Sequence, residues 1–252
     1  MLVRSIALTL LLAGCVTHPL APTPHAPLAW RPVELFDTTR QRPVPVVLYG
    51  AARARRPKPL AIISHGYGGH STDYTFIASA LARRGYIVAS IEHLERSGDP
   101  RMANSGNLVE LRRPVWQIGA DSIGFVISEL RRRGLADHTR VVLVGHSNGG
   151  DMTMLFSSQH RGDVQAAFSL DHRRMPVPRT ARPRICSARS NDYAADPGVL
   201  PVAAERDALG MVMAEVPVKH NDMLDSASPQ QQQAILEVLA ACLDGHLVKQ
   251  HS

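Results

Sequence analysis

The chain has 252 residues, 44% of them hydrophobic, which is enough to form the core of one sizeable domain. Its formal charge is +6, but the arginines are scattered in pairs and triples and aromatic residues make up only 5%. This pattern argues against a nucleic-acid-binding protein, whose basic residues more often form a stripe interleaved with aromatic side chains. Beyond the amino-terminal segment, no stretch is long and apolar enough to span a bilayer.

The amino terminus has the pattern of an export signal. Arg4 precedes an apolar run from Ile6 to Ala13, which is too short to span a membrane. The run ends in Leu12-Ala13-Gly14-Cys15, which resembles the bacterial lipobox, where the cysteine becomes the lipidated first residue of the mature protein. We therefore expect residues 1–14 to be a lipoprotein signal peptide and Cys15 to be the membrane anchor. An ordinary signal peptide with an incidental Cys15 remains the alternative.

The segment that follows the cysteine is rich in proline. Val16 is not the aspartate that would suggest retention in the inner membrane, so we expect an outer-membrane lipoprotein facing the periplasm. Residues 15–32 contain five prolines, which interrupt helix and sheet hydrogen bonding and predict a semi-rigid tether. The catalytic domain is then expected to cover residues 33–252.

Short apolar runs alternate with helical patterns through the rest of the chain. The first half predicts an opening strand pair, Val33–Asp37 and Val44–Tyr49, then a buried strand Leu60–Ser64, a helix Tyr74–Arg84 and a strand Tyr86–Ile91. A loop from Arg96 to Pro114 is followed by a helix over Trp116–Leu130, a strand Val141–Val144, a helix to about Gln159 and a strand Val164–Leu170. The end of the chain predicts strands Arg184–Ala188 and Met211–Val218 around a helix Ala203–Leu209, and a last helix from Ser228-Pro229. This alternation favours a mostly parallel sheet covered by helices on both faces.

One five-residue motif carries the chemistry. Gly145-His146-Ser147-Asn148-Gly149 matches G-x-S-x-G and lies between a predicted strand and a predicted helix. A sharp turn at this place puts the serine in a strained conformation with its hydroxyl exposed, and flanking glycines avoid clashes. Ser147 is therefore the candidate nucleophile, and His146 is its neighbour rather than its base.

With this motif in its context, the sequence resembles the α/β-hydrolase superfamily from Val33 to Gly245, most closely its dienelactone-hydrolase-like and cutinase-like members. The resemblance implies an α/β-hydrolase fold with a mostly parallel central sheet of about eight strands. It also implies no large cap domain, because only about a dozen residues separate Asp171 from the next strand.

The same resemblance assigns partners to Ser147. The backbone N–H groups of Tyr67, in His65-Gly66-Tyr67-Gly68-Gly69, and of Asn148 would form the oxyanion hole. His220, after the last predicted strand, would be the general base.

The acid of the triad has three candidates. Asp192 is preferred because it lies at the usual distance after the strand Arg184–Ala188. Asp196 is the alternative acid, because the segment 196–201 resembles the D-x-x-V-P pattern of many relatives. Asp171, after the preceding strand, occupies a position that holds the acid in a minority of the superfamily.

Two further features stay open on sequence alone. Cys186 and Cys242 would lie in a late strand and the last helix, where an oxidising compartment would let them pair, or they are two separate buried thiols. Arg101, Arg112 and Arg113 either favour an acidic substrate or are solvated loop charges.

We expect a serine hydrolase that cleaves small-molecule or polymeric carboxylic esters through an acyl-enzyme. No metal or nucleotide motif occurs, so no cofactor is expected. The partners are then the ester substrate and, through the anchor, the membrane, with no nucleic acid and a monomer as the default state. An amidase or peptidase, a lactonase, an acyltransferase or a non-catalytic surface-tethered binding protein are the alternatives, because fold does not fix substrate.

Overall fold

The computed structural model describes residues 29–50 and 56–245. The predicted signal peptide, Cys15 and the tether as far as residue 28 lie outside the described residues. Within the two described ranges, no helix has the length and apolar character needed to cross a bilayer.

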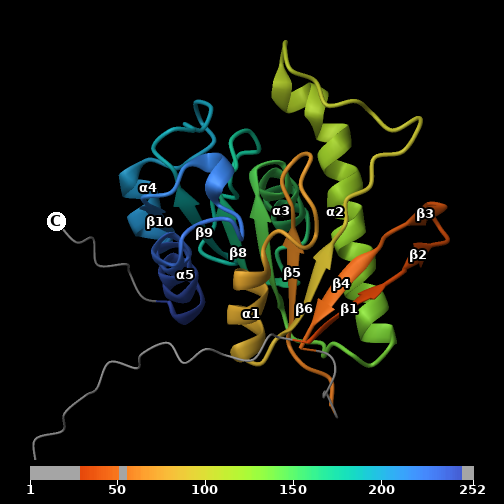
Figure 1. The fold of residues 1–252 in the computed structure, drawn as a ribbon. Helices are drawn as coiled ribbons and strands as arrows, with labels where there is room; N and C mark the ends of the chain where they lie inside the picture. Colours follow the sequence, from red (N-terminus) through yellow and green to blue (C-terminus); the bar gives the residue numbers. More distant parts are fainter. Residues whose placement is uncertain (1–28, 51–55, 246–252) are drawn as a thin grey trace, which may run out of the picture.

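An eight-stranded sheet in the order β1-β4-β6-β5-β7-β8-β9-β10 forms the centre of the molecule (Figure 1). The pairs β1–β4 and β4–β6 are antiparallel, and every pair from β6 to β10 is parallel. The strands of this sheet are β1 (Trp30–Val33), β4 (Val46–Tyr49), β5 (Leu60–Ser64), β6 (Ile87–Ile91), β7 (Val141–His146), β8 (Val164–Leu170), β9 (Arg184–Arg189) and β10 (Val212–Glu215). The short strands β2 (Phe36–Asp37) and β3 (Arg42–Pro43) pair separately. The mostly parallel sheet predicted from the sequence is therefore confirmed.

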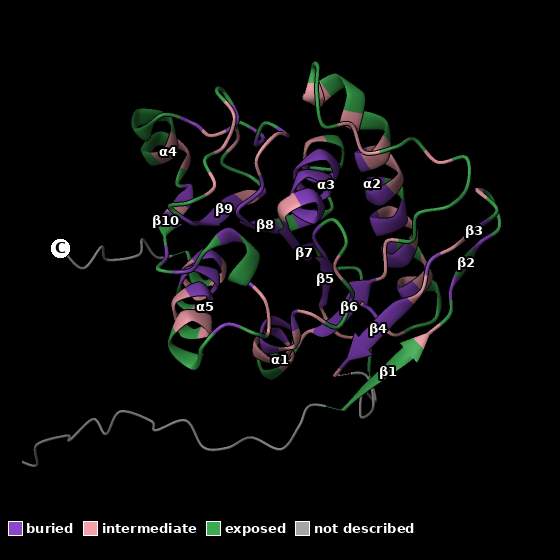
Figure 2. Ribbon diagram, turned by 45° about the horizontal axis from the view of Figure 1, so that its top comes forward, coloured by how far each residue is buried: buried purple, intermediate pink, exposed green. Residues whose placement is uncertain are grey.

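Helices cover both faces of this sheet, as Figure 2 shows. The helices are α1 (Thr75–Arg83), α2 (Leu108–Arg132), α3 (Ser147–Gln159), α4 (Ala203–Leu209) and α5 (Pro229–Asp244). Successive side chains of β5 point to opposite faces of the sheet. Leu60 and Ile62 pack in the core with α2 and α3, while Ala61 and Ile63 pack with α1 and α5. The β5 run is continuously apolar because both of its faces are buried.

The observed elements differ most from the predicted ones at two places. The predicted opening strand Val33–Asp37 is divided, because β1 begins at Trp30 and ends at Val33, and β2 forms a separate hairpin with β3. Helix α2 begins at Leu108, within the predicted loop from Arg96 to Pro114. The side chain of Asn107 caps this helix by accepting the N–H of Glu110, and the helix continues through Pro114 although proline lacks a donor N–H.

Cys186 and Cys242 form a disulfide, with 5.9 Å between their Cα atoms. The disulfide joins β9 to α5, the helix that packs on β8, β9 and β10. Of the two possibilities left by the sequence, a disulfide and two separate thiols, the structure shows the disulfide.

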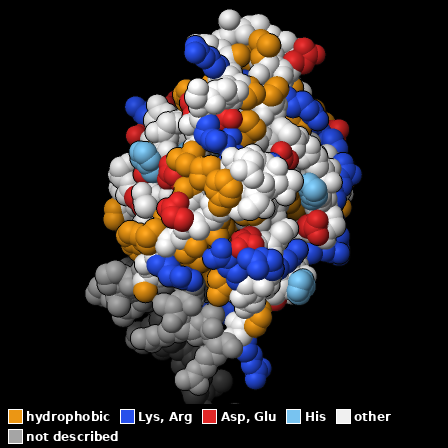
Figure 3. Space-filling view, turned by 90° about the vertical axis from the view of Figure 1, so that its right-hand side faces the viewer, with side chains coloured by type: hydrophobic (Ala, Val, Ile, Leu, Met, Phe, Trp, Pro, Cys, Tyr) orange, Lys and Arg blue, Asp and Glu red, His pale blue; other side chains and the backbone are white. Residues whose placement is uncertain are grey.

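No cap is inserted between β8 and β9, a stretch that the structure describes in full. Residues 171–183, between β8 and β9, contain neither helix nor strand. On the face of the molecule that Figure 3 shows, basic side chains lie among acidic, hydrophobic and polar ones rather than in a single stripe.

Candidate active site

The turn between β7 and α3 holds Ser147 in a strained backbone conformation. Its φ is +49°, in the left-handed region that non-glycine residues rarely occupy. A Cβ on Gly145 would lie 2.3 Å from the carbonyl oxygen of Gly149, and a Cβ on Gly149 would lie 2.3 Å from that of Ser64. The turn therefore needs glycine at both places, and it presents the serine hydroxyl to the surface clefts beside it.

Ser147 and His220 lie in hydrogen-bond contact although 73 residues separate them. The Nε2 atom of His220 is 3.1 Å from the Oγ of Ser147, and its Nδ1 is 2.9 Å from the Oδ2 of Asp171. His220 opens a 3-10 helix (His220–Asp222) in the loop between β10 and α5. A serine, an imidazole and a carboxylate thus form a continuous hydrogen-bonded line at the carboxyl edge of the sheet.

The preferred acid of the sequence analysis is wrong. Asp192 does come close to His220, but its Oδ1 accepts the backbone N–H of that residue at 2.9 Å rather than a proton of the ring. The alternative acid, Asp196, is also wrong, because its Oδ1 binds the Nε of Arg173 at 2.9 Å. The carboxylate that contacts the imidazole belongs to Asp171, the least favoured of the three candidates for the acid on sequence alone.

Asp171 is fully buried and every part of its carboxylate is used. Its Oδ1 pairs with Arg189 at 2.9 Å, and its Oδ2 accepts the hydroxyl of Ser190 as well as the Nδ1–H of His220. Its φ of +57° turns the chain sharply at the end of β8. The ion pair and these hydrogen bonds fix the orientation of the carboxylate against the imidazole.

Two other rings lie close to the ring of His220. Tyr193 stacks on it with 3.7 Å between centroids, and the ring of His146 lies 4.9 Å away on centroid distance. The guanidinium of Arg173 covers the Tyr193 ring at 4.8 Å. Sequence reasoning missed Tyr193, and only its position after β9, the strand next to Asp171, could have drawn attention to it.

His146 connects three segments of the site. Its Nε2 lies 3.0 Å from the carbonyl oxygen of His220, so this nitrogen carries the proton. Its Nδ1 then accepts the hydroxyl of Tyr74 at 2.8 Å, and the same hydroxyl oxygen accepts the N–H of Gly66 at 3.2 Å. Burial lowers the pKa of His146 to about 3, so the ring is neutral and its hydrogen bonds are fixed.

Tyr67 and Asn148, the residues predicted to form the oxyanion hole, both lie beside Ser147. Tyr67 is exposed and borders the two clefts that Ser147 lines. Asn148 is in the first turn of α3, where N–H groups have no partner within the helix, and its side-chain oxygen accepts the indole N–H of Trp116 at 2.9 Å. Their placement suits the predicted role, which stays a prediction.

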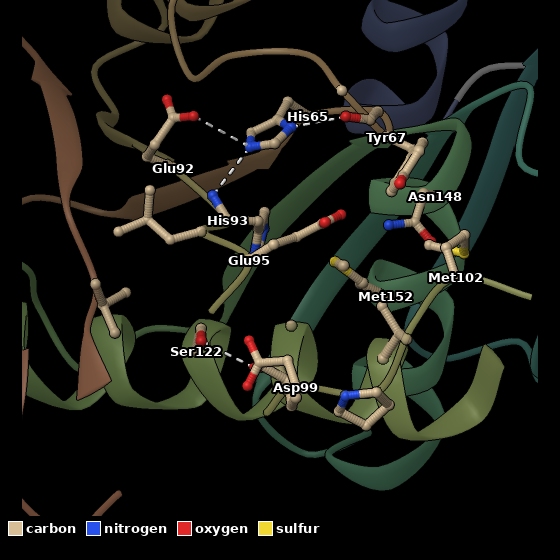
Figure 4. A pocket seen from close by; sticks show the side chains of 18 of the residues that line it. His65, Tyr67, Glu92, His93, Glu95, Asp99, Met102, Ser122, Asn148 and Met152 are labelled. Atoms are coloured by element: carbon tan, nitrogen blue, oxygen red, sulfur yellow. Dashed lines mark hydrogen bonds and ion pairs between the residues drawn. The ribbon is translucent and has the colours of Figure 1, made fainter. Parts of the chain in front are cut away.

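Ser147 lines two clefts, and a third, smaller pocket lies beside its neighbour Asn148. The polar cleft, about 310 Å³, is lined by Tyr67, Met102, Asn104, Arg112, Ser147, Asn148, Asp151, Arg174 and Tyr193. The histidine cleft, about 450 Å³, adjoins it at Tyr67, Ser147 and Tyr193 and is also lined by His146, His220 and their neighbours. The small pocket, about 60 Å³, lies behind Tyr67 and Asn148 among Leu94, Val115, Ile118 and Met152, as Figure 4 shows in part.

Comparison with known proteins gives partial sequence matches. A family model described as platelet-activating factor acetylhydrolase, isoform II, matches residues 39–104. The platelet-activating factor acetylhydrolase of Cavia porcellus is 27% identical over 159 residues, covering 47% of this chain and 36% of that protein. A second curated relative, from Nocardia uniformis, is matched over 47% of its length. The chain therefore spans less than half the length of these curated relatives.

Similarity to solved structures extends over most of the chain. A ferulic acid esterase from Streptomyces cinnamoneus superposes with a TM-score of 0.65 at 20% identity, covering 92% of this chain and 94% of that one. A dienelactone hydrolase from Anabaena variabilis superposes with a TM-score of 0.55 at 14% identity, covering 88% and 100%. Since the sheet order, the strand-to-helix serine and these superpositions agree, the chain has the fold of the α/β-hydrolase superfamily.

Proposed function

We propose that this protein is a serine hydrolase that cleaves carboxylic esters. The observation that carries the proposal is the hydrogen-bonded line from Ser147 through His220 to Asp171, with distances of 3.1 and 2.9 Å. A serine on a strained turn, an adjacent base and an acid that orients the base are the parts that nucleophilic acyl transfer requires.

In the first half of the reaction, the Oγ of Ser147 attacks the ester carbonyl while Nε2 of His220 takes its proton. Asp171 holds the Nδ1–H of His220 and stabilises the imidazolium that forms. The negative charge on the carbonyl oxygen is stabilised by the N–H groups of Tyr67 and Asn148. The imidazolium then donates its proton to the departing alcohol, which leaves an acyl group on Ser147.

In the second half, His220 takes a proton from a water molecule that attacks the acyl carbonyl. The same two N–H groups stabilise the second tetrahedral intermediate, and its collapse returns the proton to Ser147 and releases the acid. All the groups needed belong to the chain itself.

Esters are favoured over amides by the relatives. The names of the Cavia porcellus and Streptomyces cinnamoneus proteins describe ester-cleaving enzymes, and the described connection between β8 and β9 contains no cap that would restrict the site to small substrates. Both a small ester and the end of a polymer would reach Ser147 through the open histidine cleft.

Labelling with a fluorophosphonate tests the proposal directly. The probe reacts only with an activated serine, so we expect the wild-type protein to be labelled and Ser147→Ala to remain unlabelled. An ester panel of increasing acyl length should show turnover that Ser147→Ala reduces by several orders of magnitude. Absence of both labelling and turnover would instead favour a non-catalytic binding protein.

We also propose that the protein is exported and anchored through Cys15. The lipobox-like segment supports this, and so does the disulfide between Cys186 and Cys242, because disulfides persist mainly in oxidising compartments. Incorporation of labelled palmitate into the full chain, and its loss in Cys15→Ala, tests the anchor. Fractionation of the membranes then tests the expected outer-membrane location.

A further inference from the structure

The polar cleft contains two arginines in addition to the serine. Arg112 comes from the second turn of α2, and Arg174 comes from the loop after β8. Both line the same hollow as Ser147, although 62 residues separate them in the chain. Folding has therefore placed two like charges together beside the nucleophile, which costs free energy unless an anion compensates for it.

Among the described residues, neither arginine has partners for all of its side-chain donors. The side chain of Arg174 is only 11% exposed, yet its Nε has no hydrogen-bond partner among the described residues, and its nearest carboxylate, Asp196, is 3.9 Å away. In the described part of the chain, the side chain of Arg112 makes a single hydrogen bond, from Nε to the carbonyl oxygen of Ala103. The Nη1 and Nη2 atoms of Arg112 donate no hydrogen bond to the described residues and are available to a ligand.

One acidic side chain in the cleft offsets part of this charge. The Oδ1 of Asp151 accepts the backbone N–H groups of Arg174 and Met175 at 3.0 and 2.8 Å, so this carboxylate mainly fixes the loop. Burial raises the pKa of Asp151 to about 6. Burial and the charge of Arg174 both lower the pKa of Arg112. Asp196 does not line the cleft and is paired more closely with Arg173 than with Arg174, so the lining itself has two cations against one carboxylate.

The position of His220 decides which part of an ester enters this cleft. His220 must give its proton to the departing alcohol, and it lines the histidine cleft but not the polar cleft. The alcohol therefore leaves through the histidine cleft, and the acyl chain extends past Asn148 into the polar cleft.

We infer that the polar cleft is an acyl subsite for a carboxylate, and that the preferred substrates are half-esters of dicarboxylic acids, with Arg112 and Arg174 binding the free carboxylate. This inference rests on the proposed ester hydrolysis at Ser147. Guanidinium groups suit the task because they donate paired hydrogen bonds to a carboxylate.

The test compares esters that differ only in the distal charge. Monoethyl glutarate and monoethyl adipate are measured against diethyl glutarate and ethyl hexanoate by pH-stat titration, since ethyl half-esters do not cyclise readily as aryl half-esters do. We expect wild-type kcat/KM to favour the half-esters by about 10- to 100-fold, the usual effect of a charged hydrogen-bonded pair. In Arg112→Gln and in Arg174→Gln this ratio should fall towards one.

Arg113 supplies a matched control. It adjoins Arg112 and carries the same charge, but it is exposed and does not line the cleft. Arg113→Gln should therefore keep the wild-type ratio. An equal fall in Arg113→Gln would overturn the subsite, because overall charge would then explain the preference.

Calorimetry of glutarate binding to Ser147→Ala gives a readout without turnover. We expect binding to this variant and at least tenfold weaker binding when Arg174→Gln is added. Wild-type protein that hydrolyses neutral esters without preferring half-esters overturns the subsite and leaves the proposed function standing. If the wild type hydrolyses no ester, the proposed function fails and the glutarate measurement alone decides the subsite.

Discussion

Asp171 contacts the ring of His220, whereas Asp192 contacts only its main chain. The two contacts have equal heavy-atom lengths of 2.9 Å, so distance alone does not tell the two roles apart. Only the Asp171 contact can choose the tautomer of the imidazole and stabilise its positive charge. Asp192 instead fixes the backbone from which the ring extends, so the two carboxylates hold His220 at different points.

Asp171→Asn should therefore have a far larger effect than the same change at the other two candidates. An amide presents a donor or an uncharged acceptor to Nδ1, so kcat should fall by roughly 10³- to 10⁴-fold. In Asp192→Asn and Asp196→Asn, kcat should fall by less than about tenfold, because neither side chain contacts the ring. Initial rates on one good ester measure all three variants. A larger loss in Asp192→Asn than in Asp171→Asn would refute the assignment.

Tyr74→Phe removes the hydroxyl that links Gly66 to His146. Both groups are buried there, and leaving a buried donor or acceptor without a partner costs about 1–3 kcal/mol. We expect urea unfolding to show a loss of about 2 kcal/mol. Because Gly66 precedes Tyr67, kcat should fall more than KM rises. Tyr86→Phe is the matched control, since Tyr86 lies between α1 and β6 and its hydroxyl bonds the side chain of Gln165, which lines neither cleft beside Ser147.

The disulfide should contribute strongly to stability. It closes a loop of 56 residues, for which the chain-entropy model gives about 4 kcal/mol. The double variant Cys186→Ala/Cys242→Ala should unfold at a correspondingly lower urea concentration. Dithiothreitol should lower the stability of the wild type and leave the double variant unchanged. A wild type that is insensitive to dithiothreitol while its thiols titrate as free would contradict this expectation.

The regular elements of the fold were predictable because a buried face requires apolar residues at the spacing of the helix or strand. The β5 run Leu60–Ser64 is observed with the predicted bounds, since a strand buried on both faces must be continuously apolar. The start of α2 was not predictable in the same way. Pro114 signals a break, and only the tertiary contacts of α2 with the sheet and α3 explain why the helix continues through it.

The acid was the part of the site that sequence order alone could not decide. Asp171, Asp192 and Asp196 all follow strands at the correct edge of the sheet. What separates them is the direction of each side chain, which depends on the positive φ of Asp171 and on the pairing of Arg173 with Asp196. Neither feature leaves a periodic signal in the sequence, whereas Ser147 and His220 could be placed by motif and order.

Acid should destabilise the protein through its buried histidines. Burial lowers the pKa of both His146 and His172 to about 3, while a histidine in the unfolded chain has a pKa near 6.5. Between these values the unfolded state binds more protons, so this contribution is fully present above about pH 6.5 and is lost as the pH falls towards 3. Asp151 acts in the opposite sense, because its pKa is raised to about 6 and its contribution is lost as the pH rises.

Burial also lowers the pKa of His93, so three buried histidines outweigh one aspartate, and urea unfolding should show a lower free energy of unfolding at pH 5 than at pH 7. His172→Asn removes one of these histidines and keeps a polar atom near Ser169, which the ring contacts at 2.7 Å. The loss between the two pH values should then shrink by about 2 kcal/mol, the value for one proton over 1.5 pH units. His138 is exposed, so His138→Asn should leave the loss as it is in the wild type. If His172→Asn and His138→Asn behave alike, the acid sensitivity has its origin elsewhere in the protein.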